Sequence, residues 1–371
     1  MSTLKIKPKL ANKSKINRYL KLIDKNRYYS NFGPLYEFTR KKISKDYKLR
    51  KNDLILTSSG HSSVLACCYY LKSITKKKIV ITTSFNFFSS PQAILQSGFK
   101  PYFIDIELNS FSINFNDLEQ AIKINKKNLA GILIPSPFGY PIDIKRLNFI
   151  QKKYNIDIIY DAADTFINFD KFLDKSKIMI CCSFHPTKSL PSNESGLIIC
   201  PKKKYERLKS IISFGYSGVN REANLVGFNG KFSEYDAAIF LANYEEKKFI
   251  KKKIFEKLNF FNSCIENLNI KNLVLQKNLG KSWISTKICF YSKNKSILVL
   301  SKMFQKFGIE IYSAWNKKPM HLHKLFKKYK KGKMTNTLKI YKHFFTIPLN
   351  IDMKKSDIQN IISAINKIYS I

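Results

Sequence analysis

The segment SFHPTKSLPSN, residues 183–193, places a lysine in a loop between two apolar runs. Lys188 follows the run 178–182, and a second run, bounded by Gly196 and Pro201, follows the loop. The pattern predicts a connection between two buried strands at a sheet edge. A desolvated lysine amine there loses its proton readily and becomes a nucleophile that can form a Schiff base with a carbonyl group. The alternative is an ordinary solvated lysine.

The motif TSSGHSS follows an earlier apolar run and has the composition of a helix start. Ser58 or Ser59 can cap the helix, and Gly60 allows other backbone to come close. The free amides of His61 and Ser62 would then point outward and form an anion site. An ordinary capped helix is the alternative.

Two carboxylates and a phenylalanine complete this set of side chains. The apolar run 156–160 ends in Asp161, and a carboxylate there must be solvated, paired or functional, because unpaired burial is costly. If the turn is helical, Asp164 lies close enough to repel Asp161 unless a cation or a proton intervenes. Phe87, in the segment SFNFFSS, can stack on a planar ring or belong to the core.

The elements around these residues alternate between short apolar runs and helical patterns, which is typical of a mostly parallel sheet with helices on both faces. In such sheets ligands bind beyond the carboxyl ends of the strands. We therefore expect the polar segments above to meet at one edge. The expected strands are 54–56, 79–82, 102–106, 131–134, 156–160, 178–183 and 197–200, and the expected helices are 62–71, 91–96, 118–124 and 144–153.

The rest of the chain predicts a smaller α/β unit joined by a long helix that begins near Ser233. We expect a large domain over residues 1–240, with 1–50 leading into it, and a linking helix and small C-terminal domain over 241–371. The expected elements of the small domain are strands at 287–291, 309–312 and 344–348 and helices at 296–307 and 357–369.

The net charge of +40 first suggests a nucleic acid or an anionic surface as partner. However, only seven of the 66 basic residues are arginine, the residue that recognises bases and phosphates in bidentate fashion. The lysine runs are scattered and are not interleaved with aromatic residues as in single-strand binders. A lysine-biased proteome explains the charge better, and we expect no nucleic-acid partner.

Seven cysteines lie inside apolar runs, and none forms a CxxC pair. Such cysteines behave as small hydrophobic residues, so we expect neither disulfides nor a metal site, and a reducing cytoplasm as the location. No apolar stretch approaches the length that spans a bilayer, so we expect no membrane insertion.

One ligand accounts for all of these side chains together, namely pyridoxal 5'-phosphate. Its phosphate suits the helix start and Ser183, and its ring suits Phe87. Its pyridine nitrogen suits Asp161, which keeps the nitrogen protonated, and its aldehyde suits Lys188. Each signal alone is weak, but their order along the chain and their convergence on one edge are specific.

Several longer motifs then occur in order along nearly the whole chain, and the lysine motif is the most specific of them. They are NFGPL, SSGHSSVLA, SFNFFSSPQAILQSGFKPYFIDI, IPSPFGYPIDI, YDAAD, SFHPTKSLPSNESG, VGFNGKFSEYDAAIFLANYEE and FTIPLNIDMKKSDIQNII. With these motifs the chain resembles the fold-type I, pyridoxal-phosphate-dependent sugar-nucleotide aminotransferases of the DegT and StrS type. The resemblance implies a large domain with a mostly parallel seven-stranded sheet and a smaller C-terminal α/β domain.

The resemblance also implies a role for each site residue. Lys188 would bind the cofactor aldehyde, Asp161 the pyridine nitrogen, and Phe87 the face of the ring. The phosphate would be held by the cofactor-binding residues Gly60, His61 and Ser183.

Asn229, in the segment GFNGKFSE, resembles a family residue that reaches the phosphate from the neighbouring subunit, which implies a homodimer with a shared active site. The resemblance further implies glutamate as the common amino donor and a keto-sugar on a nucleoside diphosphate as acceptor. The product would serve a surface polysaccharide, such as lipopolysaccharide, or a natural product.

The chain departs from the family pattern at four places. Asp164, expected to face the ring hydroxyl, stands where relatives often carry Gln, His or Glu, and a second carboxylate there should raise the proton affinity around Lys188. His61 replaces the usual threonine, Lys231 replaces a common arginine, and NESG at 193–196 replaces a glycine-richer GEGG.

Two other functions are open. One is a relative that dehydrates the sugar, in which a histidine typically replaces the lysine, so Lys188 argues against it. The other is a noncatalytic binding or regulatory protein with a basic surface, against which the complete cofactor set argues. The basic loop at 321–333, HLHKLFKKYKKGK, is expected in the smaller domain, where its lysines either steer and hold the substrate diphosphate or are merely solvated.

Overall fold

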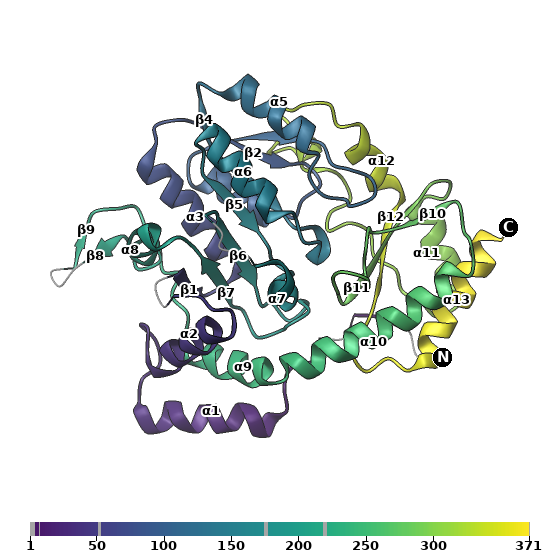
Figure 1. The fold of residues 1–371 in the computed structure, drawn as a ribbon, viewed down its shortest axis with the longest axis horizontal. Coiled ribbons are helices and arrows are strands. Elements are labelled where there is room, and N and C mark those ends of the chain that lie inside the picture. Colours follow the sequence, from purple (N-terminus) through teal and green to yellow (C-terminus); the bar gives the residue numbers. More distant parts are fainter. Residues whose placement is uncertain (1–3, 7, 51–52, 174–176, 218–220, 371) are drawn as a thin grey trace.

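The computed structural model describes residues 4–6, 8–50, 53–173, 177–217 and 221–370. Its largest feature is a seven-stranded sheet in the order β1-β7-β6-β5-β4-β2-β3 (Figure 1). Its strands are parallel except β7, which is antiparallel to both neighbours. The predicted α/β fold class is confirmed. The strands are β1 (Leu54–Thr57), β2 (Ile79–Thr83), β3 (Lys100–Ile104), β4 (Leu129–Pro135), β5 (Ile158–Asp161), β6 (Met179–Ser183) and β7 (Gly196–Ile199).

Helices cover both faces of this sheet because successive strand residues point into two different cores. Leu54 and Leu56 belong to one core, whereas Ile55 belongs to the other. Helices α3, α4 and α8 contribute to the core of Ile55, and α2, α5, α6 and α9 to the opposite one. The helices of this part are α1 (Lys13–Asn26), α2 (Pro34–Asp46), α3 (Gly60–Ile74), α4 (Ser89–Gln96), α5 (Phe115–Asn125), α6 (Ile144–Tyr154), α7 (Phe169–Phe172), α8 (Lys202–Ile211) and α9 (Glu234–Glu245).

A smaller antiparallel sheet, in the order β10-β11-β12, lies beside the large one, and α10 runs from the large part to the small part (Figure 1). The large part also carries a short hairpin that projects from its surface. The hairpin strands are β8 (Tyr216–Ser217) and β9 (Glu222–Ala223), and the remaining elements are β10 (Leu273–Leu275), β11 (Lys287–Ser292), β12 (Phe344–Pro348), α10 (Lys247–Glu266), α11 (Ile297–Gln305), α12 (Thr335–His343) and α13 (Lys355–Tyr369).

The expected linking helix exists, but it is divided into two. Ser233 caps its start as expected, because its hydroxyl accepts a hydrogen bond from the amide of Asp236 at 3.0 Å. Glu246 ends α9 and begins α10, with its amide donating to the carbonyl of Asn243 at 3.0 Å. The continuous helical pattern therefore becomes two consecutive helices.

The prediction of a strand at 309–312 is wrong. Ile309 forms an isolated bridge with Leu4, and Tyr312 forms another with Thr346, so the two ends of this run pair with different partners. The third strand of the small sheet is instead β10, which the sequence analysis did not identify. Residues 4–6 therefore lie against the segment 308–312, which in turn contacts β12 of the small sheet.

Two further features concern the helices and the cysteines. Among the described residues, no helix combines the length and the apolar character needed to cross a membrane. The seven cysteines are all free, and six of them are buried.

Candidate active site

The N-terminus of α3 meets the end of β6 at Gly60. Ser59 is the cap, since its hydroxyl accepts a hydrogen bond from the amide of Ser62 at 3.0 Å. The amide of Ser62 is therefore already used, contrary to expectation, and the amides of Gly60 and His61 are the ones that begin the helix without an intrahelical acceptor. A Cβ atom at Gly60 would lie 2.5 Å from the Cβ of Ser183. These residues form a cradle suited to an anion.

Replacing Gly60 by alanine tests this cradle. The added methyl group would force Ser183 and the first turn of α3 apart, so we expect the affinity for pyridoxal phosphate to fall by at least about tenfold. Equilibrium binding followed by visible absorbance measures the effect. The matched control is Gly332→Ala, because the nearest neighbour of a Cβ there lies at 3.9 Å. Equal affinities of the two variants would contradict the prediction.

The side chain of His61 is directed toward α4 rather than into the cradle. Its Nδ1 atom lies 3.0 Å from Oγ of Ser89, and its Nε2 atom lies 3.1 Å from Oε1 of Gln96. The replacement of the usual threonine by His61 therefore leaves the backbone amide as its contribution to the anion site.

Asp161 is the last residue of β5 and lies beside the lysine loop. Its Oδ2 atom accepts a hydrogen bond from the hydroxyl of Ser90 at 2.5 Å. Burial raises the pKa of Asp161, while the Ser90 hydrogen bond and the charge of Lys188 oppose that rise. A buried carboxyl whose ionised form is disfavoured gains most from a cationic partner.

Lys188 lies in the loop between β6 and β7, as predicted, and is partly buried. The loop is held by the amide of Lys188, which donates to the carbonyl of His185 at 2.8 Å. Burial lowers the pKa of Lys188, Asp164 and Asp161 raise it, and Lys287 lowers it again. The net result is a lysine amine that is less basic than usual, which suits a nucleophile.

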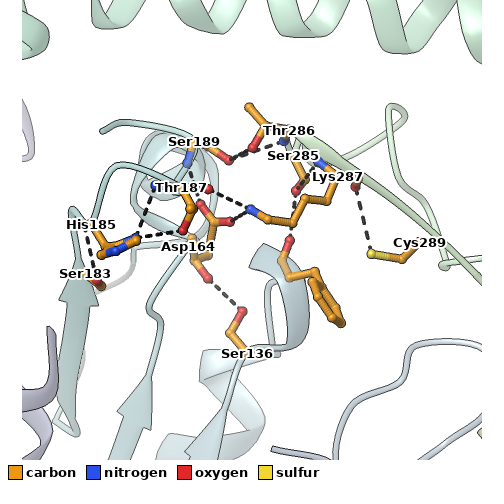
Figure 2. A network of polar contacts seen from close by, with 12 residues as sticks. Ser136, Asp164, Ser183, His185, Thr187, Ser189, Ser285, Thr286, Lys287 and Cys289 are labelled. Carbon is orange, nitrogen blue, oxygen red and sulfur yellow. Dashed lines mark hydrogen bonds and ion pairs between the residues drawn. The ribbon is translucent and has the colours of Figure 1, made fainter. Parts of the chain in front are cut away.

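Asp164 is paired with a lysine that the sequence analysis missed. Its Oδ1 atom accepts a hydrogen bond from the amide of Ser189 at 2.6 Å, and its Oδ2 atom lies 2.9 Å from Nζ of Lys287 (Figure 2). Burial would raise the pKa of Asp164, but Lys287, Lys188 and the amide of Ser189 outweigh it and lower the pKa. Lys287 is thus the cation that pairs with the buried carboxylate of Asp164.

The remaining predicted residues, Phe87 and Asn229, are exposed. The ring of Phe87 is 50% exposed and meets Phe88 edge-on, with ring centroids 6.1 Å apart. Asn229 lies on a segment fixed next to α3, where the amide of Ser58 donates to the carbonyl of Gly230 at 2.9 Å. The structure thus brings together the lysine, both carboxylates and the cradle, whereas no contact among the described residues joins Phe87 or Asn229 to Lys188.

The basic loop at 321–333 lies along the large sheet, not in the small part as expected. The amide of Gly332 donates to the carbonyl of Phe103 in β3 at 2.9 Å, and Phe326 packs edge-on against the ring of Phe103. His321 lies 2.6 Å from the hydroxyl of Ser84, and burial lowers its pKa to about 4, so it is uncharged at neutral pH. Phe326, which is buried, therefore fastens the loop to the sheet edge.

A pocket opens beside Lys188, between the lysine loop and the small sheet. It is lined by Lys188, Thr187 and Lys287, and by Ile6 and Pro8 from the start of the chain. Neither Asp161 nor the cradle at Gly60 lines this pocket, so it lies on the side of the lysine loop that faces the small sheet.

The arrangement fits pyridoxal 5'-phosphate. The cradle at Gly60 has the shape and the amides for a phosphate, and Asp161 suits a protonated ring nitrogen. The weakly basic amine of Lys188 suits an aldehyde. Among the described residues, no group of three or more His, Cys, Asp or Glu side chains could hold a metal ion.

Comparison with known proteins agrees with this arrangement. A family model for the DegT/DnrJ/EryC1/StrS aminotransferase family matches residues 11–366. A dTDP-4-amino-4,6-dideoxy-D-glucose transaminase from Shigella dysenteriae is 29% identical over 230 residues, which are 61% of this chain and 60% of that relative. The match therefore spans less than two thirds of that relative. A UDP-4-amino-4,6-dideoxy-N-acetyl-beta-L-altrosamine transaminase from Campylobacter jejuni is 25% identical and covers 84% of each chain.

The fold is also shared with a solved structure from Bacillus cereus, described as a PLP-dependent aminotransferase. The TM-score is 0.89 at 25% identity, and the alignment covers 97% of this chain and 98% of that chain. Since the family model spans nearly the whole sequence and the fold agrees, the chain belongs to the DegT/DnrJ/EryC1/StrS aminotransferase family, whose cofactor is pyridoxal 5'-phosphate.

Proposed function

We propose that this chain transfers an amino group from an amino acid, with glutamate as the donor, to a keto-sugar carried on a nucleoside diphosphate. The sugar exchanges its carbonyl oxygen for the amino group, and the donor becomes a 2-oxo acid. The observation that carries the proposal is the convergence of Lys188 and Asp161 beside the anion cradle at Gly60. Relatives named as sugar transaminases support the substrate class. The aminosugar would enter a surface polysaccharide, such as lipopolysaccharide, or a natural product.

The residues of the site have different chemical roles. When bound, pyridoxal phosphate supplies an aldehyde that links to an amine and a ring that accepts electrons. Asp161, oriented by Ser90, would hold the proton on the ring nitrogen. Lys188 would bind the aldehyde and afterwards, as a free amine, take the proton from the donor carbon that bears the amino group. In the second stage it would give a proton to the sugar carbon that receives the amino group. The amides of Gly60 and His61 would bind the phosphate.

The expected homodimer is supported by an exposed apolar surface next to Asn229. Phe214 is 54% exposed and Val226 is 71% exposed, and both lie on the segment that leads to Asn229. A second copy that covers these side chains would bring Asn229 to the neighbouring active site. Sedimentation of the purified protein at micromolar concentration would show a dimer, and a monomer would contradict this part of the proposal. The free buried cysteines support a reducing compartment, the cytoplasm.

A spectroscopic experiment tests the proposed function. Protein loaded with pyridoxal phosphate is mixed with glutamate, and we expect the visible absorbance of the lysine-bound cofactor to be replaced by that of the aminated cofactor. Addition of a nucleotide-linked keto-sugar should then reverse the change. A noncatalytic protein would show no change with any amino acid, and a dehydratase relative would not return the amino group to a sugar.

The basic loop is expected to contribute to acceptor binding. Phe326 anchors the loop to the sheet edge, whereas Lys327, Lys328 and Lys330 are exposed, so their amines remain available to a diphosphate. A variant with Lys327, Lys328 and Lys330 changed to glutamine should raise the KM for the acceptor several-fold, while the KM for glutamate stays the same. Steady-state kinetics at two salt concentrations measures this. An unchanged acceptor KM with unchanged salt dependence would show that the loop is only solvated.

A further inference from the structure

We propose that Lys287 is a positioning residue that clamps both sides of Lys188 to the small sheet and cancels the charge of Asp164. The proposal rests on the proposed function, because it concerns the amine that binds the cofactor. Lys287 is the first residue of β11 and is separated from Asp164 by 123 residues along the chain. The pair thus joins the small sheet to the active-site edge of the large one (Figure 2).

The clamp consists of hydrogen bonds to the residues before and after Lys188. Nζ of Lys287 donates to the carbonyl of Thr187 at 2.9 Å and to Oδ2 of Asp164 at 2.9 Å. Oδ1 of Asp164 accepts from the amide of Ser189 at 2.6 Å. One ion pair therefore fixes the peptide groups on both sides of Lys188, which restricts the positions that its amine can take.

The segment that carries Lys287 is itself held firmly to the large part. The hydroxyl of Ser285 donates to the carbonyl of Phe138 at 2.9 Å. The backbone amide of Ile284 donates to Oδ1 of Asn168 at 3.0 Å, and the side-chain Nδ2 of Asn168 donates to the carbonyl of Ile284 at 2.9 Å. The position of Lys287 is therefore set by the contact between the two parts of the molecule.

Burial makes the charge balance important. The side chain of Lys287 is 15% exposed and that of Asp164 is 5% exposed, so neither charge is well solvated. The charges that act on Lys188 are Asp164, Asp161 and Glu194, which favour its protonated form, and Lys287, which disfavours it. With Asp164 and Lys287 opposing each other, Asp161 remains as the larger of the other two charges that act on Lys188. Removal of either partner would leave an unpaired buried charge next to the amine.

The two single variants should therefore have opposite effects on the proton at Lys188. In Lys287→Met, the unpaired carboxylate of Asp164 should raise the pH at which the lysine-bound cofactor loses its proton, by about one unit or more. In Asp164→Asn, the unpaired ammonium group of Lys287 should lower that pH by a similar amount. The double variant should titrate near the wild type. The visible absorbance of the cofactor-loaded protein is measured as a function of pH. It gives the midpoint of the titration for the wild type, for each single variant and for the double variant.

A matched control separates this effect from loss of packing. Lys204 forms a buried ion pair with Asp157 away from the lysine loop, and its side chain is 3% exposed. Lys204→Met should lower the unfolding temperature without moving the midpoint. If the two single variants at the clamp shift the midpoint in the same direction, or do not shift it, the proposal is wrong.

Thermal unfolding of the ligand-free proteins provides a second test that does not need the cofactor. Each single variant should unfold at a lower temperature than the wild type, and the double variant should recover part of the loss, because it leaves no unpaired charge. If the double variant unfolds at as low a temperature as the single variants, the proposed clamp is wrong. If the wild type gains no visible band with pyridoxal phosphate, the proposed function is wrong. The unfolding temperatures of the variants still show whether Lys287 and Asp164 form the proposed clamp.

Discussion

Replacing Lys188 by alanine will lower the rate of amino transfer by at least about 10³-fold, because the variant loses both the covalent link to the cofactor and the group that moves the proton. The amine is well placed for both roles, since burial lowers its pKa and its loop is held on both sides. Single-turnover measurements with glutamate would show the loss directly. They also separate it from slow product release.

The control for this prediction is a lysine outside the site. The side chain of Lys252 is 76% exposed on α10, and Lys252→Ala should keep the wild-type rate. Binding of pyridoxal phosphate to Lys188→Ala is expected to persist without the spectrum of a lysine link, because the cradle at Gly60 is intact. A Lys188→Ala protein that transfers amino groups within about tenfold of the wild-type rate would contradict the assigned role.

Replacing Asp161 by asparagine is expected to lower the catalytic rate and to raise the stability of the ligand-free protein. Without the carboxylate, the ring nitrogen would lose the charge that keeps it protonated, so the rate should fall by about 10²-fold or more. The ligand-free protein, however, should become more stable at neutral pH. Ser90 can still donate its hydrogen bond to the asparagine oxygen, so the local packing is retained.

The stability effect follows from the direction of the pKa shift. Burial raises the pKa of Asp161 in the folded protein above its unfolded value. Such a carboxyl contributes stability below its unfolded pKa, and this contribution is lost as the pH rises through the folded pKa. At neutral pH the ionised side chain therefore lowers the free energy of unfolding, and asparagine removes that cost.

Chemical denaturation of the ligand-free variants at neutral pH checks this prediction. Asp157→Asn is the contrasting variant, because it removes the partner of the buried Lys204 and should lower the free energy of unfolding. An Asp161→Asn protein that is less stable than the wild type and keeps its catalytic rate would show that Asp161 is a structural residue rather than the partner of the cofactor nitrogen.

Sequence patterns predicted the large sheet because its strands are fully buried and read as short apolar runs between helical patterns. The same patterns failed where strand pairing is brief. The run at 309–312 has the composition of a strand, but its ends pair with Leu4 and Thr346, which lie far away in the sequence. The strand β10 has only three residues, all of them partly exposed, so it lacks the length and the burial by which the strands of the large sheet are recognised.

The lysine loop and Asp161 could be predicted because each follows its own buried strand directly. Lys287 could not, because nothing local distinguishes it from the other lysines of a strongly basic chain. Its importance comes from a contact with Asp164 across the junction of the two sheets. The available signal was Asp164 itself, since a buried carboxylate requires a partner, although the sequence does not say which one.

Chemical trapping shows whether Lys188 is the residue that binds the cofactor aldehyde. Protein incubated with pyridoxal phosphate is reduced with borohydride, which makes the link between a lysine amine and the aldehyde permanent, and is then digested and analysed by mass spectrometry. We predict one pyridoxyl phosphate group on the peptide that contains Lys188, formed at a cofactor concentration equal to that of the protein. Modification spread over exposed lysines, with Lys188 unmodified, would show that Lys188 does not bind the cofactor.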